Sequence, residues 1–334
     1  MRSRTALAGL LIAFLLGAGF VASQRHAPKA AAPERVVIAA TTEYVGACAI
    51  VAAQRQGYFS AEHLAAVIQP HSTGKAALQS MLQGRADMAT AADIPLMFAA
   101  LSGSPVRVVA TLFRSQKDHG IVGRRDRGID GPASLKGKRI GYTAGTSGHF
   151  ALDVFLNWQR QGIGDVTLAN YPPEQLDDAL IRGEVDAVVS WEPFLSESRG
   201  RLGENAVSFS SEEMYESIFN LAGMQQYVLS RPETMRRMLR ALVQGSRYCR
   251  ENPEAMQPLL AATEKMSRQA VLANWPSYRF EVSLDQGLLL ALEDRARWAI
   301  RNRLGTGAQM PNFLDYVYLD ALASVQPSAV TIIH

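Results

Sequence analysis

The chain has 334 residues, of which 48% are hydrophobic and 19% are charged. That composition excludes an intrinsically disordered chain, and the length allows two domains that each have a core. The formal net charge is +3, and loss of Arg2 and Arg4 with the N-terminal segment leaves 32 basic against 31 acidic residues, a net charge of +1. Such a balance gives no indication of nucleic-acid binding.

The N-terminal segment predicts a secretory signal peptide over residues 1–23. Arg2 and Arg4 precede an apolar run at residues 5–21, and the small residues at its end suit cleavage. The run is short for a membrane span, although an uncleaved N-terminal anchor is the alternative. Residues 24–34 are rich in Ala and Pro and predict a flexible leader. We therefore expect a periplasmic protein.

From residue 35 the sequence alternates between short apolar strands and helices. Gly57 and Gly84 end two of the predicted helices, and Pro95 suits the first turn of a third. Strands that alternate with helices in this way predict parallel strands joined by right-handed crossovers, with ligands at the carboxyl edge of the sheet. The predicted strands cover residues 36–40, 65–69, 86–90 and 106–112, and the predicted helices cover 45–56, 76–83 and a stretch from about 95.

The pattern restarts after residues 120–124, which we expect to lead the chain into a second domain. A strand at 220–224 or at 226–230 then leads into a helix at 232–251, and the remainder is expected to be largely helical. Two amphipathic segments lie in that remainder, at 286–303 and 313–325. Within the second domain we predict strands at 139–142, 166–170 and 187–190, and helices at 147–160 and 173–181.

Cys48 and Cys249 are the two cysteines of the chain. Export would permit a disulfide between them, but both lie in apolar helical segments, and we expect two buried free thiols. The six histidines show no metal-binding spacing such as HxxxH. We therefore predict neither a metal site nor a cofactor.

The loop at Thr143–Ser147 follows a predicted strand, is rich in small residues and hydroxyls, and opens a helix. A helix N-terminus carries unpaired N–H groups and a partial positive charge, so a small anion can approach it closely. Capping of that helix by Thr146 or Ser147 is the alternative explanation. Similar arrangements recur elsewhere in the chain, which favours the interpretation as a binding site.

Four segments carry a family resemblance, and they are specific in combination. They read RQGYFSAEHL at 55–64, STGKAALQSMLQGRADMATAADIPLMFA at 72–99, SLKGKRIGYTAGTSGHF at 134–150 and GEVDAVVSWEPF at 183–194. Together they resemble the periplasmic substrate-binding proteins of ABC importers, in the NMT1/THI5-like branch that captures sulfonates, taurine, nitrate and pyrimidine precursors. The resemblance covers roughly residues 35–260.

The resemblance implies an α/β protein with the two-lobe, type II periplasmic-binding-protein fold. Parallel-dominated sheets would be flanked by helices, with a helical tail at the C-terminus. It places the first lobe at 35–120 plus 225–334 and the second at 121–224. It implies a monomeric solute trap, not an enzyme, whose lobes close on a small-molecule ligand for an ABC permease and its ATPase.

Candidate ligand-binding residues lie in five loops that follow predicted strands. Most of these loops also open a helix, so capping by Thr42 or Glu43, by the loop at residues 72–74, or by Asp93 is the alternative role. A lysine in the first turn of a helix opposes its dipole, so we expect Lys75 to point to solvent, and we expect His149 to pack. The candidates are Thr42, Glu43, Tyr44, Ser72, Thr73, Gly74, Thr90, Ala92, Asp93, Thr143, Gly145, Thr146, Ser147, Trp191 and Glu192.

Three acidic residues in these loops, Glu43, Asp93 and Glu192, bear on the class of ligand. No arginine lies in the same loops, and carboxylates in a cleft would repel a sulfate or phosphate group. We therefore expect a zwitterion or a nitrogen heterocycle to be favoured over a simple anion. An enzyme of menaquinone- or pyrimidine-precursor chemistry, with Glu43 and His149 as its acid–base pair, and an extracytoplasmic sensor domain are the alternative functions.

Overall fold

The computed structural model describes residues 32–42, 44–210, 212, 214–262, 267–305 and 309–333. The chain divides into the units Met1–Pro33 and Glu34–His334, and only two residues of the first are described, so the fold is that of the second. The predicted signal peptide, most of the leader and Glu43 lie outside the described residues. Within the described ranges, no helix is long and apolar enough to cross a membrane.

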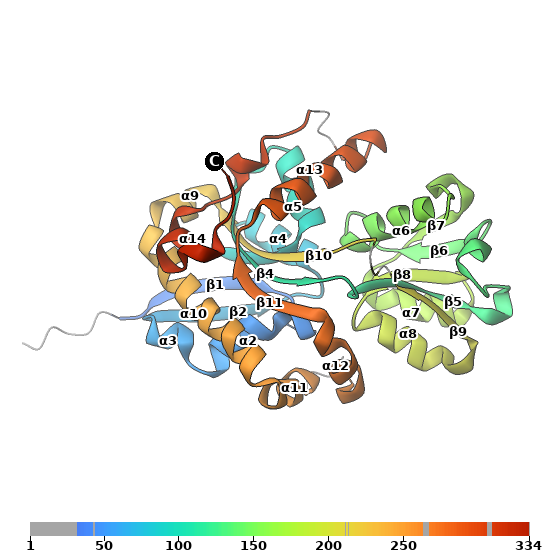
Figure 1. Ribbon diagram of the computed structural model, residues 1–334, viewed down its shortest axis with the longest axis horizontal. Coiled ribbons are helices and arrows are strands. Elements are labelled where there is room, and N and C mark those ends of the chain that lie inside the picture. The colour runs from blue at the N-terminus through green and yellow to red at the C-terminus, as the bar shows by residue number, and fades with distance from the viewer. Residues whose placement is uncertain are drawn as a thin grey trace, which may run out of the picture. The chain divides into compact units, whose positions relative to one another are not determined.

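The larger sheet has six strands in the order β11-β4-β10-β3-β1-β2 (Figure 1). Strand β1 pairs in parallel with β2 and β3, so the carboxyl ends of these three strands share one edge, as the sequence predicted. Strands β10 and β11 pair antiparallel to their neighbours. The bounds are β1 Glu34–Ala40, β2 Leu64–Pro70, β3 Met88–Ala92, β4 Val106–Ser115, β10 Ser217–Met224 and β11 Tyr278–Ser283.

The smaller sheet has five strands in the order β7-β6-β8-β5-β9. Strand β6 pairs in parallel with β7 and β8, whereas β5 pairs antiparallel with β8 and β9. Both sheets are therefore mixed, with parallel pairs beside antiparallel ones. The bounds are β5 His119–Arg124, β6 Arg139–Tyr142, β7 Thr167–Asn170, β8 Ala187–Trp191 and β9 Ala206–Ser210.

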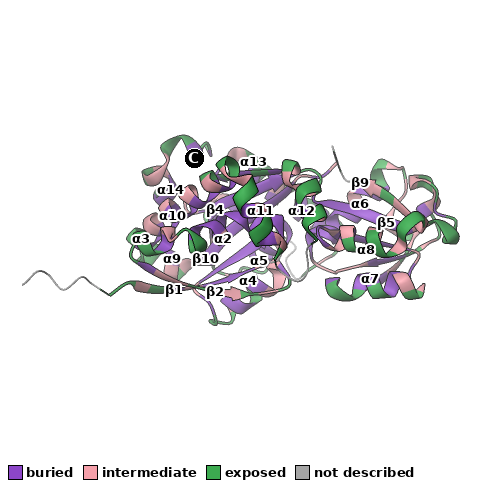
Figure 2. Cartoon of the chain, turned by 90° about the horizontal axis from the view of Figure 1, so that it is seen from below, coloured by how far each residue is buried: buried purple, intermediate pink, exposed green. Residues whose placement is uncertain are grey.

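Helices cover both sheets, and Figure 2 shows buried strands between helices whose outward surfaces are exposed. Around the larger sheet lie α2 Cys48–Arg55, α3 Tyr58–Ala61, α4 Gly74–Leu82, α5 Asp93–Leu101, α9 Gln225–Ser230, α10 Pro232–Glu251, α11 Pro253–Ala261, α12 Arg268–Asn274, α13 Gln286–Arg301 and α14 Asp320–Val325. Around the smaller sheet lie α6 Ser147–Trp158, α7 Pro173–Arg182 and α8 Phe194–Leu202. Short 3-10 helices occupy Val45–Ala47, Arg125–Arg127, Pro132–Leu135, Ile163–Asp165, Gly203–Asn205, Trp275–Ser277, Phe313–Tyr316 and Pro327–Ala329.

The chain passes between the two sheets twice, at residues 116–118 between β4 and β5 and again in the connection from β9 to β10. We call the larger sheet with its helices the first lobe and the smaller sheet with its helices the second lobe. Residues 217–224, which the sequence assigned to the second lobe, pair between β3 and β4 in the first. The returning chain joins the first lobe earlier than predicted because β10 already belongs to the larger sheet.

Cys48 and Cys249 form a disulfide, so the prediction of two free thiols was wrong. Their Cα atoms are 6.1 Å apart, and the two residues are separated by 201 positions in the sequence. Helices α2 and α10 pack closely because Gly245 has no side chain: a Cβ atom there would lie 2.2 Å from the carbonyl oxygen of Ala49. The two apolar helical segments that suggested separate burial are thus packed against each other.

Candidate functional site

A cavity of about 30 Å³ lies between the lobes, where loops from both sheets meet. We call it the interlobe cavity. Its walls come from the carboxyl ends of β1, β2 and β3 and the start of β10 in the first lobe, from the end of β8 and the loop after β6 in the second, and from Asp118 and His119 where the chain enters β5. The lining residues are Thr41, Tyr44, Thr73, Gly74, Lys75, Ala92, Pro95, Asp118, His119, Thr146, Ser147, Trp191, Ser217 and Phe219.

The loop after β1 contributes two polar atoms that have no hydrogen-bond partner among the described residues. These are the hydroxyls of Thr41 and Tyr44, both buried. Tyr44 is 4% exposed, and its ring packs edge-on against Phe113 and Phe219. A buried hydroxyl without a partner costs free energy, so a ligand that satisfies it gains affinity.

Thr90 supports this loop from behind the cavity. Its hydroxyl accepts a hydrogen bond of 3.2 Å from the backbone N–H of Thr41, and the side chain does not line the cavity. Thr90 therefore positions Thr41. Thr42, the other described candidate in this loop, is partly buried and lies outside the cavity wall.

The loop after β2 opens α4 beside the cavity. The Thr73 hydroxyl caps this helix, since it accepts a 3.0 Å hydrogen bond from the N–H of Ala76. Gly74 allows the helix to approach β3: a Cβ atom there would lie 2.9 Å from the Cα of Ala91. Capping and cavity lining thus coincide at Thr73, whereas Ser72 is exposed and lies outside the wall.

Lys75 does not point to solvent, contrary to the expectation from the helix dipole. Its ammonium donates a 2.9 Å hydrogen bond to the carbonyl of Ala144, which belongs to the second lobe. The hydrogen bond to Ala144 outweighs the unfavourable interaction of the ammonium with the positive end of the helix dipole. The ammonium group has three donors, so it can hold Ala144 and still donate to a ligand.

In the second lobe, neither Thr146 nor Ser147 caps α6 with its side chain. The Thr146 hydroxyl donates to the carbonyl of Thr143 at 2.7 Å, and the Ser147 hydroxyl lies 2.8 Å from Nε2 of His119. Both residues are buried and line the cavity. The capping explanation therefore does not hold here, and the N-terminus of α6 opens onto the cavity with its backbone donors uncapped by side chains.

Asp118 and His119 line the cavity and were not among the sequence candidates. Asp118 is buried in the crossing segment, and Tyr278 donates to its carboxylate. Burial raises the pKa of Asp118 to about 7, with Glu192 adding to the rise and hydrogen bonds from Tyr278 and Ser217 opposing it. Burial, together with the charge of Arg295, lowers the pKa of His119 to about 3, so the imidazole is neutral.

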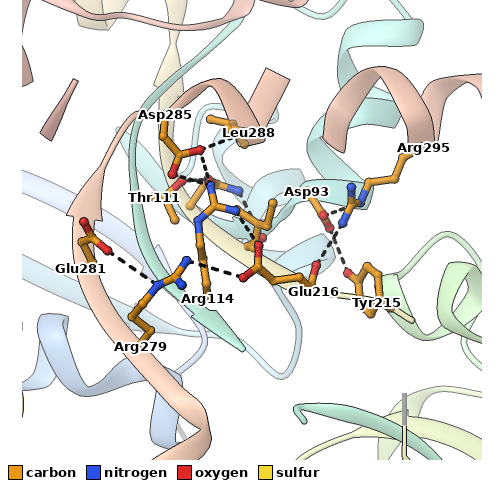
Figure 3. Close-up of polar contacts among 12 residues, drawn as sticks. Asp93, Thr111, Arg114, Tyr215, Glu216, Arg279, Glu281, Asp285, Leu288 and Arg295 are labelled. Atoms are coloured by element: carbon orange, nitrogen blue, oxygen red, sulfur yellow. Dashed lines mark hydrogen bonds and ion pairs between the residues drawn. The ribbon is translucent and has the colours of Figure 1, made fainter. Parts of the chain in front are cut away.

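Asp93, predicted both as a candidate contact and as a helix cap, lies away from the cavity in an ionic cluster (Figure 3). Arg295 pairs with its carboxylate at 2.5 Å, and the Tyr215 hydroxyl donates to it at 3.2 Å. The carboxylate also accepts from the N–H of Ile94 at 2.8 Å in the first turn of α5, whereas the N-cap position is Ala92 and carries no side-chain cap. The side chain is fully buried and its charge is balanced by Arg295.

Glu192 is likewise turned away from the cavity. Its carboxylate accepts from Arg199 at 2.6 Å and from the N–H of Ser196 at 3.1 Å, which fixes the start of α8. Its neighbour Trp191 does line the cavity and faces His119, with ring centroids 6.0 Å apart. Because Asp93 and Glu192 are paired with arginines outside the wall, they do not support the expected preference for a zwitterion or heterocycle.

Two candidates in the loop after β6 have other positions. The Thr143 hydroxyl donates to the carbonyl of Tyr171 at 2.9 Å, and the side chain is not in the wall of the cavity. Gly145, with φ of 70°, lies beside Lys75 and lines a neighbouring cavity. The sequence-predicted residues that the structure brings together in the interlobe cavity are Tyr44, Thr73, Gly74, Ala92, Thr146, Ser147 and Trp191.

Asp118 and His119 were missed because they lie at a crossing between lobes and not in a loop between a strand and a helix. The sequence signal was available in the pair itself, an acid and a histidine directly before the buried run of β5. His119 itself entered the sequence analysis only through the histidine spacing tested for metal binding. Strand β5 begins at His119 and pairs antiparallel with β8, so its first residue lies beside the carboxyl end of β8. A correct prediction of β5 would therefore have placed Asp118 and His119 at that edge.

Comparison with known proteins gives a consistent family and fold. The NMT1/THI5-like family model matches residues 46–256. A Bacillus subtilis (strain 168) protein named for binding aliphatic sulfonates is 22% identical over 200 residues, which are 60% of each chain. A Brucella abortus (strain 2308) protein named only as a binding protein is 25% identical over 144 residues, 42% of this chain and 45% of its own length. The chain thus matches only part of the length of these relatives.

Solved structures show the same fold at low sequence identity. The alkanesulfonate-binding protein SsuA of Xanthomonas axonopodis pv. citri, bound to MOPS, superposes with a TM-score of 0.74 at 20% identity, covering 87% of this chain and 100% of that one. A mutant of the desulfurization enzyme DszB, in complex with biphenyl-2-sulfinic acid, superposes with a TM-score of 0.63 at 18% identity, covering 88–89% of this chain and 99% of its own. Binding proteins and an enzyme therefore share this two-lobe architecture.

Proposed function

The chain belongs to the NMT1/THI5-like family, and from this membership we propose that it is the extracytoplasmic solute-binding component of an ABC importer. Its ligand is a small organic anion of the sulfonate type, held between the closing lobes. The observation that carries the proposal is the interlobe cavity, to which each lobe contributes the N-terminus of a helix and a set of hydroxyls.

The chemistry of the cavity favours an anionic headgroup. Lys75, Tyr44 and Ser147 present an ammonium and two hydroxyls, and the N-termini of α4 and α6 add backbone donors with partial positive charge. Among the described residues, Asp118 is the one carboxyl group in the wall, and its raised pKa of about 7 lets it bind a proton when an anion arrives. A sulfonate has three acceptor oxygens that match such a set of donors.

One observation and one sequence prediction support capture outside the cytoplasm. The buried disulfide Cys48–Cys249 is a feature of oxidising compartments. The predicted signal peptide at residues 1–23 would deliver the chain there. Delivery of the ligand to a permease and its ATPase follows from the proposed role, and a partner that is a sensor kinase is the alternative.

An enzymatic role on the same fold has one observation in its favour. Nε2 of His119 lies 2.8 Å from the Ser147 hydroxyl, and Nδ1 lies 3.4 Å from the Asp118 carboxylate, which is the order of groups in a serine hydrolase. A general base works best with a pKa near the operating pH, and that of His119 is lowered to about 3 by burial and by Arg295. Both cysteines are bonded to each other, so thiol catalysis has no nucleophile. We therefore assign these groups to binding.

Isothermal titration and thermal-shift measurements on the exported protein test the proposal. The panel contains alkanesulfonates, taurine, MOPS, nitrate, pyrimidine precursors and amino acids. A ligand at a hundred times its Kd stabilises the folded state by about 2.7 kcal/mol, which raises the melting temperature clearly. Binding of an alkanesulfonate supports the proposal. Hydrolysis of p-nitrophenyl acetate that disappears in Ser147→Ala, without binding of any panel member, would contradict it.

A further inference from the structure

A second cavity of about 450 Å³ adjoins the interlobe cavity and shares Lys75 and Pro95 with it. We call it the outer chamber. One side is formed by α4, α5 and the segment after α13 in the first lobe, and the other by β6 and the start of α6 in the second. It is much larger than the interlobe cavity, and it lies between the same two lobes.

The first-lobe wall of the outer chamber is largely apolar. Leu78 and Ala99 are buried, and Leu82, Phe98 and Leu304 are partly buried around them. Apolar surface of this kind gains from contact with another apolar group because water is released from both. The wall thus differs in chemistry from the hydroxyl-rich interlobe cavity beside it.

The second-lobe wall is aromatic and contains one unsatisfied polar atom. The His149 ring lies 4.8 Å from that of Tyr142 between centroids, and its Nδ1 has no hydrogen-bond partner among the described residues. His149 is 8% exposed, and burial, with Lys75 nearby, lowers its pKa to about 4, so the ring is neutral at pH 7. A buried polar atom without a partner costs free energy, so a ligand that carries a polar atom beside its apolar part gains affinity by bonding to this nitrogen.

Lys75 lies at the junction of the two cavities. Its ammonium bonds to Ala144, and Gly145 lies so close that a Cβ atom on it would be 3.1 Å from the lysine nitrogen. A single residue thus faces both the polar cavity and the apolar chamber. A ligand whose charged end contacts Lys75 from the interlobe cavity has its remaining atoms directed to the outer chamber.

We propose that the outer chamber receives the apolar part of the ligand, so that the substrates are sulfonates with a hydrophobic chain or ring and not short ones such as taurine. This inference rests on the proposed function, since it presumes that the headgroup binds in the interlobe cavity. Each methylene that enters the chamber raises affinity about fourfold. Apart from Lys75 at the junction, the residues that line the chamber carry no formal charge, so an apolar group enters it without burying a further charge.

The test is calorimetric titration of the full chain with methane-, butane-, hexane- and octanesulfonate. We expect Kd to fall about fourfold per methylene until the chamber is filled. Equal Kd values along the series would overturn the outer-chamber inference while leaving the solute-binding function intact. Absence of binding by every sulfonate and every other member of the panel would instead overturn the proposed function.

A matched pair of variants tests whether the gain in affinity with chain length arises in the outer chamber. Gln79 is exposed on α4 and lines the outer chamber, whereas Gln83, at the C-terminal end of the same helix, is also exposed but does not line it. We expect Gln79→Trp to weaken octanesulfonate binding at least tenfold and to leave methanesulfonate within twofold, while Gln83→Trp changes neither. Equal loss for both ligands, or no loss for either, in Gln79→Trp would contradict occupation of the chamber.

Discussion

Lys75 in the first lobe donates a 2.9 Å hydrogen bond to the carbonyl oxygen of Ala144 in the second. The bond joins the start of α4 to the loop before α6. The N-termini of both helices face the interlobe cavity. A ligand in this cavity contacts both lobes, and Lys75 contributes to holding them together. The proposed function thus predicts that closure of the lobes is coupled to binding through differential contacts in the closed state.

Substitution of Lys75 by methionine is expected to weaken ligand binding about tenfold, which corresponds to about 1.4 kcal/mol. Hydrogen bonds that involve a charged donor contribute about 1.5–3 kcal/mol, and exposure to solvent reduces that value. Calorimetric titration with an alkanesulfonate measures the change. The control is Lys136→Met, which removes an exposed cation in the second lobe and should leave Kd unchanged. Equal affinity of Lys75→Met and the unsubstituted protein would exclude a role of Lys75 in closure.

Tyr44→Phe separates binding from stability, because the buried Tyr44 hydroxyl has no partner among the described residues. Removal of that hydroxyl should leave the melting temperature of the empty protein unchanged or slightly higher, since no hydrogen bond is lost. Ligand affinity should fall between about twofold and tenfold, the value of one neutral hydrogen bond of about 0.5–1.5 kcal/mol. Loss of apo stability with intact affinity would show that the hydroxyl serves the fold.

Much of the fold was predictable because hydrophobic patterns and glycine positions act locally. The predicted helix at 232–251 and strand at 139–142 have the observed bounds, Pro232–Glu251 and Arg139–Tyr142. Of the two alternatives for the strand before that helix, residues 220–224 lie in β10, and 225–230 form α9. Strands β5, β9 and β11 were not predicted: residues 120–124 of β5 were interpreted as the connection into the second domain, and β9 and β11 are short, lie at the edges of their sheets and contain exposed residues.

Contacts between distant segments were not predictable from one sequence. The disulfide joins helices whose cysteines are 201 residues apart, and the partner of Asp93 is Arg295 on α13. The sequence placed Asp93 and Glu192 in loops at strand ends, but it did not show which way each carboxylate turns. The direction of each carboxylate is set by the arginine that pairs with it, Arg295 for Asp93 and Arg199 for Glu192.

The pKa of Asp118 predicts the pH dependence of binding. Burial raises this pKa to about 7 in the empty protein, and an anion nearby raises it further, so above pH 7 binding takes up a proton. We expect Kd for a sulfonate to be flat below pH 7 and to rise by up to about tenfold per pH unit above it. Asp118→Asn should abolish the slope. Tighter binding at higher pH would mean that a cationic group of the ligand faces Asp118.

The disulfide is expected to stabilise the fold without contributing to the site. Replacing both Cys48 and Cys249 by alanine should lower the free energy of unfolding by about 2–5 kcal/mol. Both side chains are fully buried, and neither lines the interlobe cavity, so Kd should stay within twofold. Urea unfolding of the variant, compared with the unsubstituted protein with and without reductant, measures the effect. If reductant had no influence on the unsubstituted protein, the stabilising role of the disulfide would be refuted.

The most direct test of the central claim is titration of hexanesulfonate into the unsubstituted protein and into the double variant Thr146→Ala, Ser147→Ala. Both residues face the interlobe cavity, and neither caps α6. Their removal should abolish binding, and the loss of their buried hydrogen bonds to Thr143 and His119 should lower the free energy of unfolding of the empty protein by about 1–3 kcal/mol without unfolding it. We predict one binding site in the unsubstituted protein and none in the variant. Unchanged binding in the variant, or a large loss of apo stability with binding retained, would contradict the assignment of the interlobe cavity as the ligand site.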